Sequence, residues 1–276
     1  MSLKEESVLL AEKALAVRRD VIRMTGLARS GFPASSLSIV DILVWLYWKA
    51  MSLRTDEPSW DDRDRFVLGK GRGCPALYAV LANRSFFPRE ELWSYRRLGA
   101  MLQGFPEVRR TPGVDAPGGS PGQGLGLANG LSLALKGKSP QPSVFCLVGD
   151  AELQEGVFWE SAMTSAHFSL ENIVLIVDRD GRQIDGSTEE IMSLEPLGEK
   201  LASFGWAVEE CDGHDFNSLD GALSSLRSRG GRPLCMVART VSGKGVSFLE
   251  RDSSGGRPLS RDFMDEALRE LERGGD

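Results

Sequence analysis

Carboxylates follow two short apolar runs near the middle of the chain, and their spacing could provide a metal site. Residues 144–148 and 173–177 have the length and the β-branched content of buried parallel strands. Asp150 comes just after the first run, and Asp178 and Asp180 follow the second. Carboxylates, a backbone carbonyl and the phosphate oxygens of a ligand make the partial coordination shell that magnesium commonly accepts. The chemistry that these positions could perform is metal-assisted binding of a phosphate.

The segment between the two runs predicts how the carboxylates would be positioned. Residues 156–168 have helical spacing, so strand, helix and strand form a βαβ unit with a right-handed crossover. Both acidic strand ends then lie at the carboxyl edge of one sheet, where open α/β sheets bind ligands. The plainer alternative is that Asp150 caps the following helix and that Asp178 or Asp180 belongs to a turn, since DRDG is favourable turn chemistry. The pattern alone supports both interpretations about equally.

Strand and helix patterns alternate along the rest of the chain. Further strands are predicted at residues 66–68, 206–210 and 234–239. Helices are predicted at residues 5–24, 39–51, 125–135, 193–204, 216–228 and 262–273, and loops at 30–38 and 251–257, the latter mobile. This alternation is typical of an α/β fold with a mostly parallel sheet sandwiched by helices. We expect one domain over residues 1–276, with residues 250–276 as a C-terminal appendage.

Composition argues against several classes of protein. The chain has 276 residues, of which 41% are hydrophobic, and its formal net charge of −6 argues against a nucleic-acid partner. No apolar run reaches the roughly 18–20 residues that cross a bilayer, and no signal peptide is recognisable, so no membrane partner is expected. The four cysteines have no Cys-x-x-Cys spacing. We interpret them as free thiols of a cytoplasmic protein.

Two glycine-rich stretches could bring the backbone close to a phosphate. Residues 69–73 follow a predicted strand and place Lys70 and Arg72 beside three glycines, although a solvated surface loop is the alternative. Residues 113–126 lead into a predicted helix, whose N-terminus is a fair anion site. A dinucleotide fingerprint is not present there, because the last glycine position is Leu127 and no convincing strand precedes the stretch.

The central stretch reads GDAELQEG, then a WESAM helix, then DRDGRQIDG. In order and spacing it resembles the diphosphate-and-metal motif of thiamine-diphosphate enzymes. The version is that of transketolases, and especially of the N-terminal subunits of split transketolases. The resemblance covers nearly the whole chain, including the segments DRDRFVLGKGRGCPALYAVL, TPGVDAPGGSPGQGLG and TVSGKGVSF. It implies the thiamine-diphosphate-binding fold (the PP-type domain), with thiamine diphosphate and Mg²⁺, or Ca²⁺ or Mn²⁺, as cofactors.

The resemblance also implies roles for individual residues. Metal ligands would be Asp150, Asp180, where the family has Asn, and the backbone carbonyl of Arg182. The same three residues and seven others would contact the cofactor: Arg72, Gly119, Pro121, Gly149, Ala151, Ile184 and Lys244. Glu155 and Glu160 would have a catalytic role in an acidic cluster that links two active sites and faces a partner subunit. Ordinary stabilisation of a helix start is the alternative for both glutamates.

The chain departs from the family at its histidines. The family has His in Gly-His-Pro-Gly-Gly, Lys-Gly-His, Gln-Gly-His-Pro and Trp-His-Gly. The first three positions are Phe32, Arg72 and Phe105 here, and ERDSSGGRP replaces the fourth segment. We expect His167 to be structural and His214 to belong to a turn or helix cap.

In the family those imidazoles hold diphosphate oxygens, contact a hydroxylated two-carbon donor and move protons. A guanidinium such as that of Arg72 pairs well with phosphate, whereas Phe32 and Phe105 cannot make hydrogen bonds. We therefore expect a donor other than the usual ketose phosphate, for example a pyruvate-like acyl donor.

A full transketolase continues with a second thiamine-binding domain and a third domain, and nothing after Val246 resembles either. We therefore expect a partner subunit that carries the pyrimidine-binding and C-terminal domains, an α2β2 assembly, and no activity without the partner. The favoured function is the diphosphate-binding subunit of a two-component transketolase-like carboligase, transferring a two-carbon ketol or acyl unit. The alternatives are an α-type subunit of a 2-oxo acid decarboxylating enzyme and a non-catalytic paralogue with a structural or regulatory role.

Overall fold

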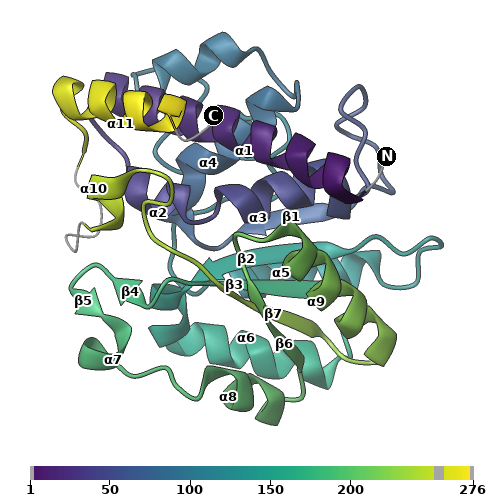
Figure 1. Cartoon of the computed structure of the whole chain (residues 1–276). Coiled ribbons are helices and arrows are strands. Elements are labelled where there is room, and N and C mark those ends of the chain that lie inside the picture. The colour runs from purple at the N-terminus through teal and green to yellow at the C-terminus, as the bar shows by residue number, and fades with distance from the viewer. Residues whose placement is uncertain (1–2, 252–257, 274–276) are drawn as a thin grey trace.

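A five-stranded parallel sheet lies at the centre of the computed structural model, which describes residues 3–251 and 258–273 (Figure 1). The strands run in the order β1-β2-β3-β7-β6. They are β1 (Arg65–Leu68), β2 (Val144–Gly149), β3 (Ile173–Arg179), β6 (Ala207–Asp212) and β7 (Leu234–Arg239). Each lies within two residues of a predicted strand, so the mostly parallel sheet is confirmed.

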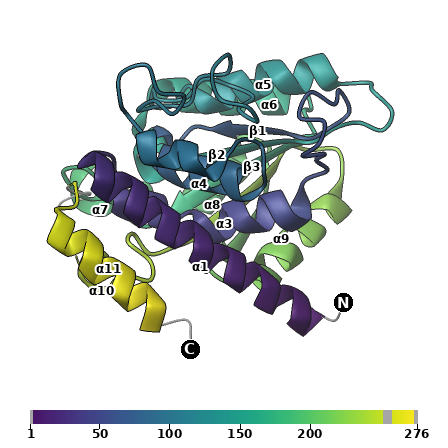
Figure 2. The same ribbon diagram turned by 90° about the horizontal axis from the view of Figure 1, so that it is seen from above.

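Helices cover both faces of the sheet, which explains why its strands are apolar throughout (Figures 1 and 2). Along β2, Phe145 and Leu147 pack on one face, whereas Val144, Cys146 and Val148 pack on the other. The first face is covered by α1 (Leu3–Ala28), α3 (Val40–Trp45), α4 (Cys74–Asn83) and α9 (Phe216–Arg229). The second is covered by α5 (Gly124–Leu135), α6 (Gly156–His167) and α8 (Leu197–Ser203).

The prediction of a loop at residues 30–38 is wrong, because Pro33–Leu37 forms a short helix, α2. Proline in the first turn has a backbone angle that suits a helix start, and Ser36 Oγ donates to the carbonyl of Phe32 at 2.9 Å. The helix predicted at residues 39–51 is present, but its second half, Leu46–Ala50, is the π-helix η1. Packing of α2 against buried neighbours outweighs its small, loop-like residue types.

Several short elements complete the chain. They are η2 (Gly71–Gly73), η3 (Arg89–Ser94), η4 (Asp150–Gln154), α7 (Thr188–Ile191), α10 (Ser247–Glu250) and a hairpin of β4 (Arg182–Gln183) and β5 (Gly186–Ser187). The sequence did not predict these elements or α4. Of the mobile loop predicted at 251–257, all but Arg251 lies outside the described residues.

Helix α11 (Arg261–Arg273) packs alongside α1 (Figure 2). Met264, Ala267 and Leu271 are buried in the contact, and a β-carbon at Gly26 would lie 2.5 Å from the Met264 sulfur. The helix of the predicted appendage therefore belongs to the same core as α1. The single domain predicted over residues 1–276 stays a prediction.

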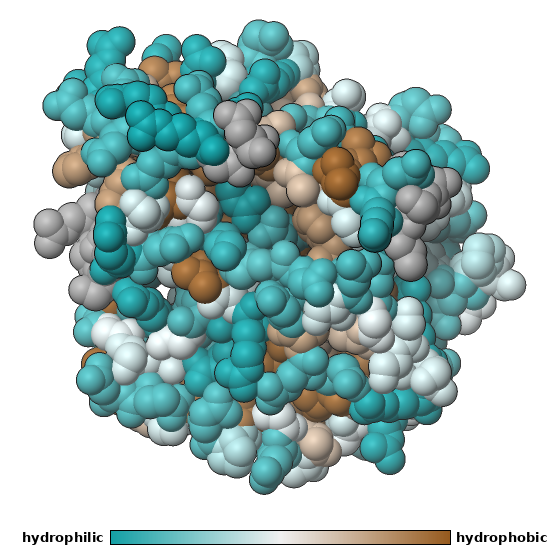
Figure 3. Space-filling view, viewed as in Figure 1, coloured by the Kyte–Doolittle hydropathy of each residue, from teal (hydrophilic) through white to brown (hydrophobic). Residues whose placement is uncertain are grey.

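The surface seen in the view of Figure 1 is mostly hydrophilic, with hydrophobic residues in small separate groups (Figure 3). Within the described ranges, none of the helices is long and apolar enough to cross a bilayer. All four cysteines are buried free thiols.

Candidate functional site

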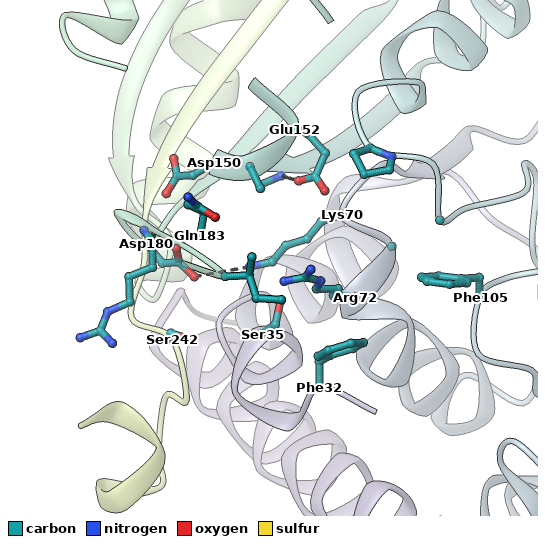
Figure 4. A pocket seen from close by; sticks show the side chains of 17 residues that line it. Phe32, Ser35, Lys70, Arg72, Phe105, Asp150, Glu152, Asp180, Gln183 and Ser242 are labelled. Carbon is teal, nitrogen blue, oxygen red and sulfur yellow. Dashed lines mark hydrogen bonds and ion pairs between the residues drawn. The ribbon is translucent and has the colours of Figure 1, made fainter. Parts of the chain in front are cut away.

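A cavity of about 280 Å³ lies at the carboxyl edge of β1, β2 and β3 (Figure 4). It is close to the lower end of the usual range for small-molecule sites, roughly 300–1,000 Å³. Nine of the ten predicted cofactor residues line it: Arg72, Gly119, Pro121, Gly149, Asp150, Ala151, Asp180, Arg182 and Ile184. Segments far apart in the sequence thus meet at one edge of the sheet.

Asp150 reaches across the sheet edge to the turn after β3. Its Oδ2 accepts the N–H of Gly181 at 2.6 Å, and its Oδ1 lies 3.1 Å from Nη1 of Arg179. The carboxylate is buried and does not cap the following helix, so the capping alternative for Asp150 is wrong. Burial raises the pKa of Asp150 to about 7, and the negative charge of Asp180 adds to this effect.

Asp180 is both a turn residue and a cavity-lining carboxylate, the two interpretations that the sequence left open. Its Oδ1 accepts the N–H of Arg182 at 3.0 Å, as the turn interpretation requires, and its side chain also lines the cavity with Asp150. Burial raises the pKa of Asp180. Asp178 lies within β3, opposite Gly149 of β2, and so is not a turn residue.

Lys70 supplies the positive charge that these carboxylates need. Its Nζ contacts Oδ2 of Asp178, lies 3.5 Å from Oδ2 of Asp180 and donates to Ser38 Oγ at 3.1 Å. Burial alone would lower the pKa of Lys70, but Asp178 and Asp180 hold it above its usual value. The sequence singled out Lys70 beside its glycines but did not place it in the site.

Asp178 ties together two walls of the cavity. Ser38, just after α2, donates to its Oδ2 at 2.8 Å, and Thr240, just after β7, donates to its Oδ1. The carboxylate is fully buried and both of its oxygens are occupied. It therefore holds the site together, whereas the carboxylates of Asp150, Glu152 and Asp180 line the cavity.

Glycines let two loops approach each other closely at the cavity wall. A β-carbon at Gly71 would lie 2.8 Å from the α-carbon of Gly119. Gly119 itself has a φ of +113°, and a β-carbon there would lie 2.8 Å from the Phe105 ring. Larger residues would fill this wall, so the glycines leave room for a ligand against the backbone.

The end of the cavity opposite Asp150 and Asp180 is formed by Phe32 and Phe105, with Arg72 between the two ends (Figure 4). The guanidinium carbon of Arg72 lies 5.1 Å from the centre of the Phe32 ring, a cation–π distance. In the part of the chain that the structure describes, this guanidinium makes no hydrogen bond or ion pair. It is therefore available to an anionic ligand.

The formal charges around the cavity cancel. Three basic side chains line it, those of Lys70, Arg72 and Arg182, and so do three acidic ones, those of Asp150, Glu152 and Asp180. Glu152 accepts the N–H of Gly149 at 2.8 Å, and burial raises its pKa. With all six groups ionised, a doubly charged anion would meet no net positive charge, and a bound cation would supply it.

Three predicted site residues lie outside this cavity. Glu155 and Glu160 are exposed at the start of α6, and Glu155 makes no capping hydrogen bond with its side chain. Lys244 instead lines two other hollows, one of which also includes Val241 and the other Arg18. The roles predicted for these three residues stay predictions. Among cavity residues that the prediction missed, Ser35 in α2, Gln183 in β4 and Ser242 after β7 carry no sequence signal beyond being polar.

The residues present fit a divalent cation held by oxygens. Oδ1 of Asp150 is buried and has no hydrogen-bond partner among the described residues, despite the nearby guanidinium of Arg179. Two carboxylates and a carbonyl suit a hard cation, whose other ligands come from water or phosphate. No group of three or more His, Cys, Asp or Glu side chains in the described ranges could hold a metal ion. The side chains alone would thus make an incomplete site.

The family model for the thiamine diphosphate binding domain of transketolase matches residues 10–272. This chain belongs to the transketolase family. The chain is 36% identical to the 6-deoxy-6-sulfo-D-fructose transketolase subunit SqwG of Clostridium sp. (strain MSTE9), over 99% of this chain and 100% of that protein. It is 34% identical to one subunit of the apulose-4-phosphate transketolase of Actinobacillus succinogenes, over 90% and 88% of the two chains.

Solved transketolase structures share its fold. The transketolase of Campylobacter jejuni superposes with a TM-score of 0.89 at 28% identity, over 99% of this chain and 43% of that one. The Leishmania mexicana transketolase gives 0.88 at 28% identity, over 95% and 41%. The chain thus spans less than half of these transketolases but nearly all of the split subunits. The predicted family and thiamine-diphosphate-binding fold are confirmed. In length and sequence the chain corresponds to the thiamine-diphosphate-binding subunit of a two-component transketolase.

Proposed function

We propose that this chain binds the diphosphate and the metal in a two-component transketolase-like enzyme, which transfers a two-carbon ketol or acyl unit. The main support for the proposal is that the carboxylates of Asp150 and Asp180 both line the same glycine-lined cavity. The similarity to named transketolase subunits over nearly the whole chain supports it.

The cofactors are thiamine diphosphate and, as the metal, Mg²⁺, with Ca²⁺ or Mn²⁺ as substitutes of similar ligand preference. Asp150, Asp180 and the carbonyl of Arg182 would hold the metal. The backbone at Gly119, Pro121, Gly149 and Ala151, together with Ile184 and Arg72, would hold the cofactor. Thiamine diphosphate supplies the carbanion chemistry when bound, and the chain's residues bind and orient it. The cancelled charge of the cavity supports a requirement for the metal.

The partner subunit would carry the pyrimidine-binding and C-terminal domains, in an α2β2 assembly without which this chain is inactive. Helix α5 offers a surface for it, because its outward residues, Leu127, Gly130, Leu133 and Ala134, include no charge. On the adjacent α6, Val157 and Met163 are 38% and 61% exposed. Glu155 and Glu160 lie on this same helix start and would face the partner. The four buried free thiols support a cytoplasmic location.

The donor would differ from the usual ketose phosphate. Phe32 and Phe105 give one end of the cavity an apolar wall, and Arg72 brings a guanidinium to it. These groups suit a small apolar chain next to a carboxylate better than a chain of hydroxyls. We therefore propose a pyruvate-like acyl donor, whose carboxylate leaves as carbon dioxide when the acyl unit is transferred. The named relatives indicate that substrates differ within the family, because their names specify different sugars.

The test is reconstitution with a partner subunit that contains the complementary transketolase domains. Transfer to an aldehyde acceptor is measured with each of the two chains by itself and with both, using pyruvate or xylulose 5-phosphate as donor. We expect transfer only from the mixture, only with thiamine diphosphate and Mg²⁺, and faster with pyruvate. Turnover by this chain alone would contradict the partner requirement. Preference for xylulose 5-phosphate would contradict the donor assignment, and no transfer from either donor would contradict the proposed function.

A further inference from the structure

His214 connects helix α3 with the segment that follows β7, part of which lines the cavity. Its Nδ1 lies 2.7 Å from Oδ2 of Asp41 on α3, and its Nε2 accepts the N–H of Val241 at 2.9 Å. A backbone N–H can only donate, so Nε2 carries no proton, and the ring proton is on Nδ1, donated to Asp41. The residue lies in the turn after β6, as predicted, and its ring is held in one defined tautomer.

The carboxylate that His214 contacts is itself fixed by α1. Nη1 and Nη2 of Arg18 donate to the two oxygens of Asp41 at 3.0 and 2.5 Å, and Nε of Arg18 donates to the carbonyl of Lys244 at 3.2 Å. Burial would raise the pKa of Asp41, but Arg18 and His214 outweigh it and hold the pKa below its usual value. His214 therefore rests on a rigid, ionised support.

These contacts hold the segment of residues 240–246 that follows β7. Thr240 is tied to Asp178 at the sheet edge, and the N–H of Gly243 donates to the carbonyl of Ala34 on α2 at 2.9 Å. Between these two ties, Ser242 lines the cavity, and so does Ser35, the neighbour of Ala34. The position of Val241 thus sets how one wall of the cavity is arranged.

We propose that His214 is a positioning residue for this cavity: through Val241 it fixes residues 240–246 and thereby the wall that contains Ser242 and Ser35. The inference rests on the proposed function for the identity of the ligand, thiamine diphosphate, but not for the contacts themselves. Without the imidazole, the Val241 N–H loses its protein acceptor, and the segment keeps its contacts at Thr240, Gly243 and Lys244 but not the one between the first two.

The test compares His214→Ala, His214→Asn and His214→Gln in the complex with the partner subunit. Asparagine can keep the contact with Asp41 but does not reach Val241, whereas the longer glutamine carries both a donor and an acceptor. By calorimetry with Mg²⁺, we expect the Kd for thiamine diphosphate to rise about five- to tenfold for Ala and Asn, because binding must then order the segment without the help of that one hydrogen bond. His214→Gln should have a Kd within about twofold of the wild-type value.

His167 provides the matched control, since it is the other of the two histidines and is exposed on α6. His167→Gln should leave the Kd unchanged. Amide exchange of Val241 and Gly243 in the free chain should quicken in His214→Ala and not in His167→Gln. Ring nitrogen NMR of the wild type should show one histidine with the proton on Nδ1, and this signal should disappear in His214→Gln.

The outcomes separate the two proposals. If the wild-type complex binds thiamine diphosphate and His214→Ala and His214→Asn bind it equally well, the positioning role is overturned while the proposed function stands. If the wild type does not bind it, the proposed function fails. The exchange data then decide the positioning role: quicker exchange in His214→Ala alone supports it, and unchanged exchange overturns it.

Discussion

The ammonium nitrogen of Lys70 lies 3.5 Å from Oδ2 of Asp180, although the two residues follow strands, β1 and β3, that are not neighbours in the sheet. The same nitrogen contacts the fully buried Asp178. The motif that this stretch resembles implies Asn at the position of Asp180, and the carboxylate adds a negative charge there. Lys70 provides the charge that balances it.

Replacing Lys70 by Met should therefore destabilise the fold strongly. It would leave Asp178 buried without its cation, a change that typically costs about 3–5 kcal/mol. Denaturant unfolding measures this loss. The matched control is Lys138→Met, because Lys138 lies 3.5 Å from Asp62 in an exposed pair, and such pairs contribute only about 0–1 kcal/mol. Equal losses in the two variants would contradict the balancing role of Lys70.

Asp41→Asn should destabilise the protein in a way that depends on pH. Although burial raises the pKa of Asp41, Arg18 and His214 hold it below the unfolded value of 3.8. The ionised carboxylate therefore contributes its full stability above that value and loses it as the pH falls through the lower, folded-state pKa.

At neutral pH the variant should lose roughly 3 kcal/mol relative to the wild type, and the difference should narrow only below about pH 4. Urea unfolding at a series of pH values measures it. Asp262→Asn, an exposed carboxylate on α11, is the control and should change little. If the stability difference between the wild type and Asp41→Asn grew as the pH fell below 4, the pKa of Asp41 would not be lowered in the folded state.

The sequence could predict the sheet edge because parallel strands bring their carboxyl ends together. Once the strands at residues 144–149 and 173–179 were recognised, the meeting of Asp150 and Asp180 followed. Lys70 and His214 could not be assigned in this way. Lys70 contacts Asp178, which is 108 residues away in the sequence and lies on β3 rather than on the strand next to β1. His214, in the turn after β6, contacts Asp41 on α3, which is 173 residues away. No spacing in the sequence encodes those contacts.

Helix α2 could not be predicted from the sequence for a different reason. Its residues, PASSL, have the composition of a loop, and the helix forms because four of the five are buried against the rest of the molecule. Tertiary packing overrides local propensity there. The cavity wall that includes Phe32 and Ser35 depends on that helix, so its shape was not predictable from the sequence.

Leu133→Glu should prevent assembly with the partner subunit. Leu133 is 42% exposed on α5, so the variant should keep the stability of the isolated chain to within about 0.5 kcal/mol. A carboxylate buried in an interface without a partner is costly, so we expect at least a tenfold weaker complex by size-exclusion titration. Val8→Glu, at a 59% exposed position of α1, should assemble normally. Normal assembly of Leu133→Glu would exclude α5 as the contact surface.

Phe105→His should shift donor preference in the assembled enzyme. An imidazole can hydrogen-bond a donor hydroxyl that the phenyl ring cannot, and sites built to bind a hydroxyl discriminate strongly. We expect kcat/KM for xylulose 5-phosphate to rise about tenfold relative to that for pyruvate. Phe263→His, on the exposed side of α11, is the control. If the ratio of the two kcat/KM values stays unchanged in Phe105→His, then Phe105 does not determine donor specificity.

In the proposed function, this chain holds thiamine diphosphate through a metal at Asp150 and Asp180. The most direct measurement is a calorimetric titration of thiamine diphosphate into the chain assembled with its partner subunit, with and without Mg²⁺. We expect binding that requires Mg²⁺, is lost in Asp150→Ala and is kept in Asp262→Ala. Wild-type protein that does not bind in the presence of Mg²⁺, or Asp150→Ala that binds as the wild type does, would contradict the proposed function.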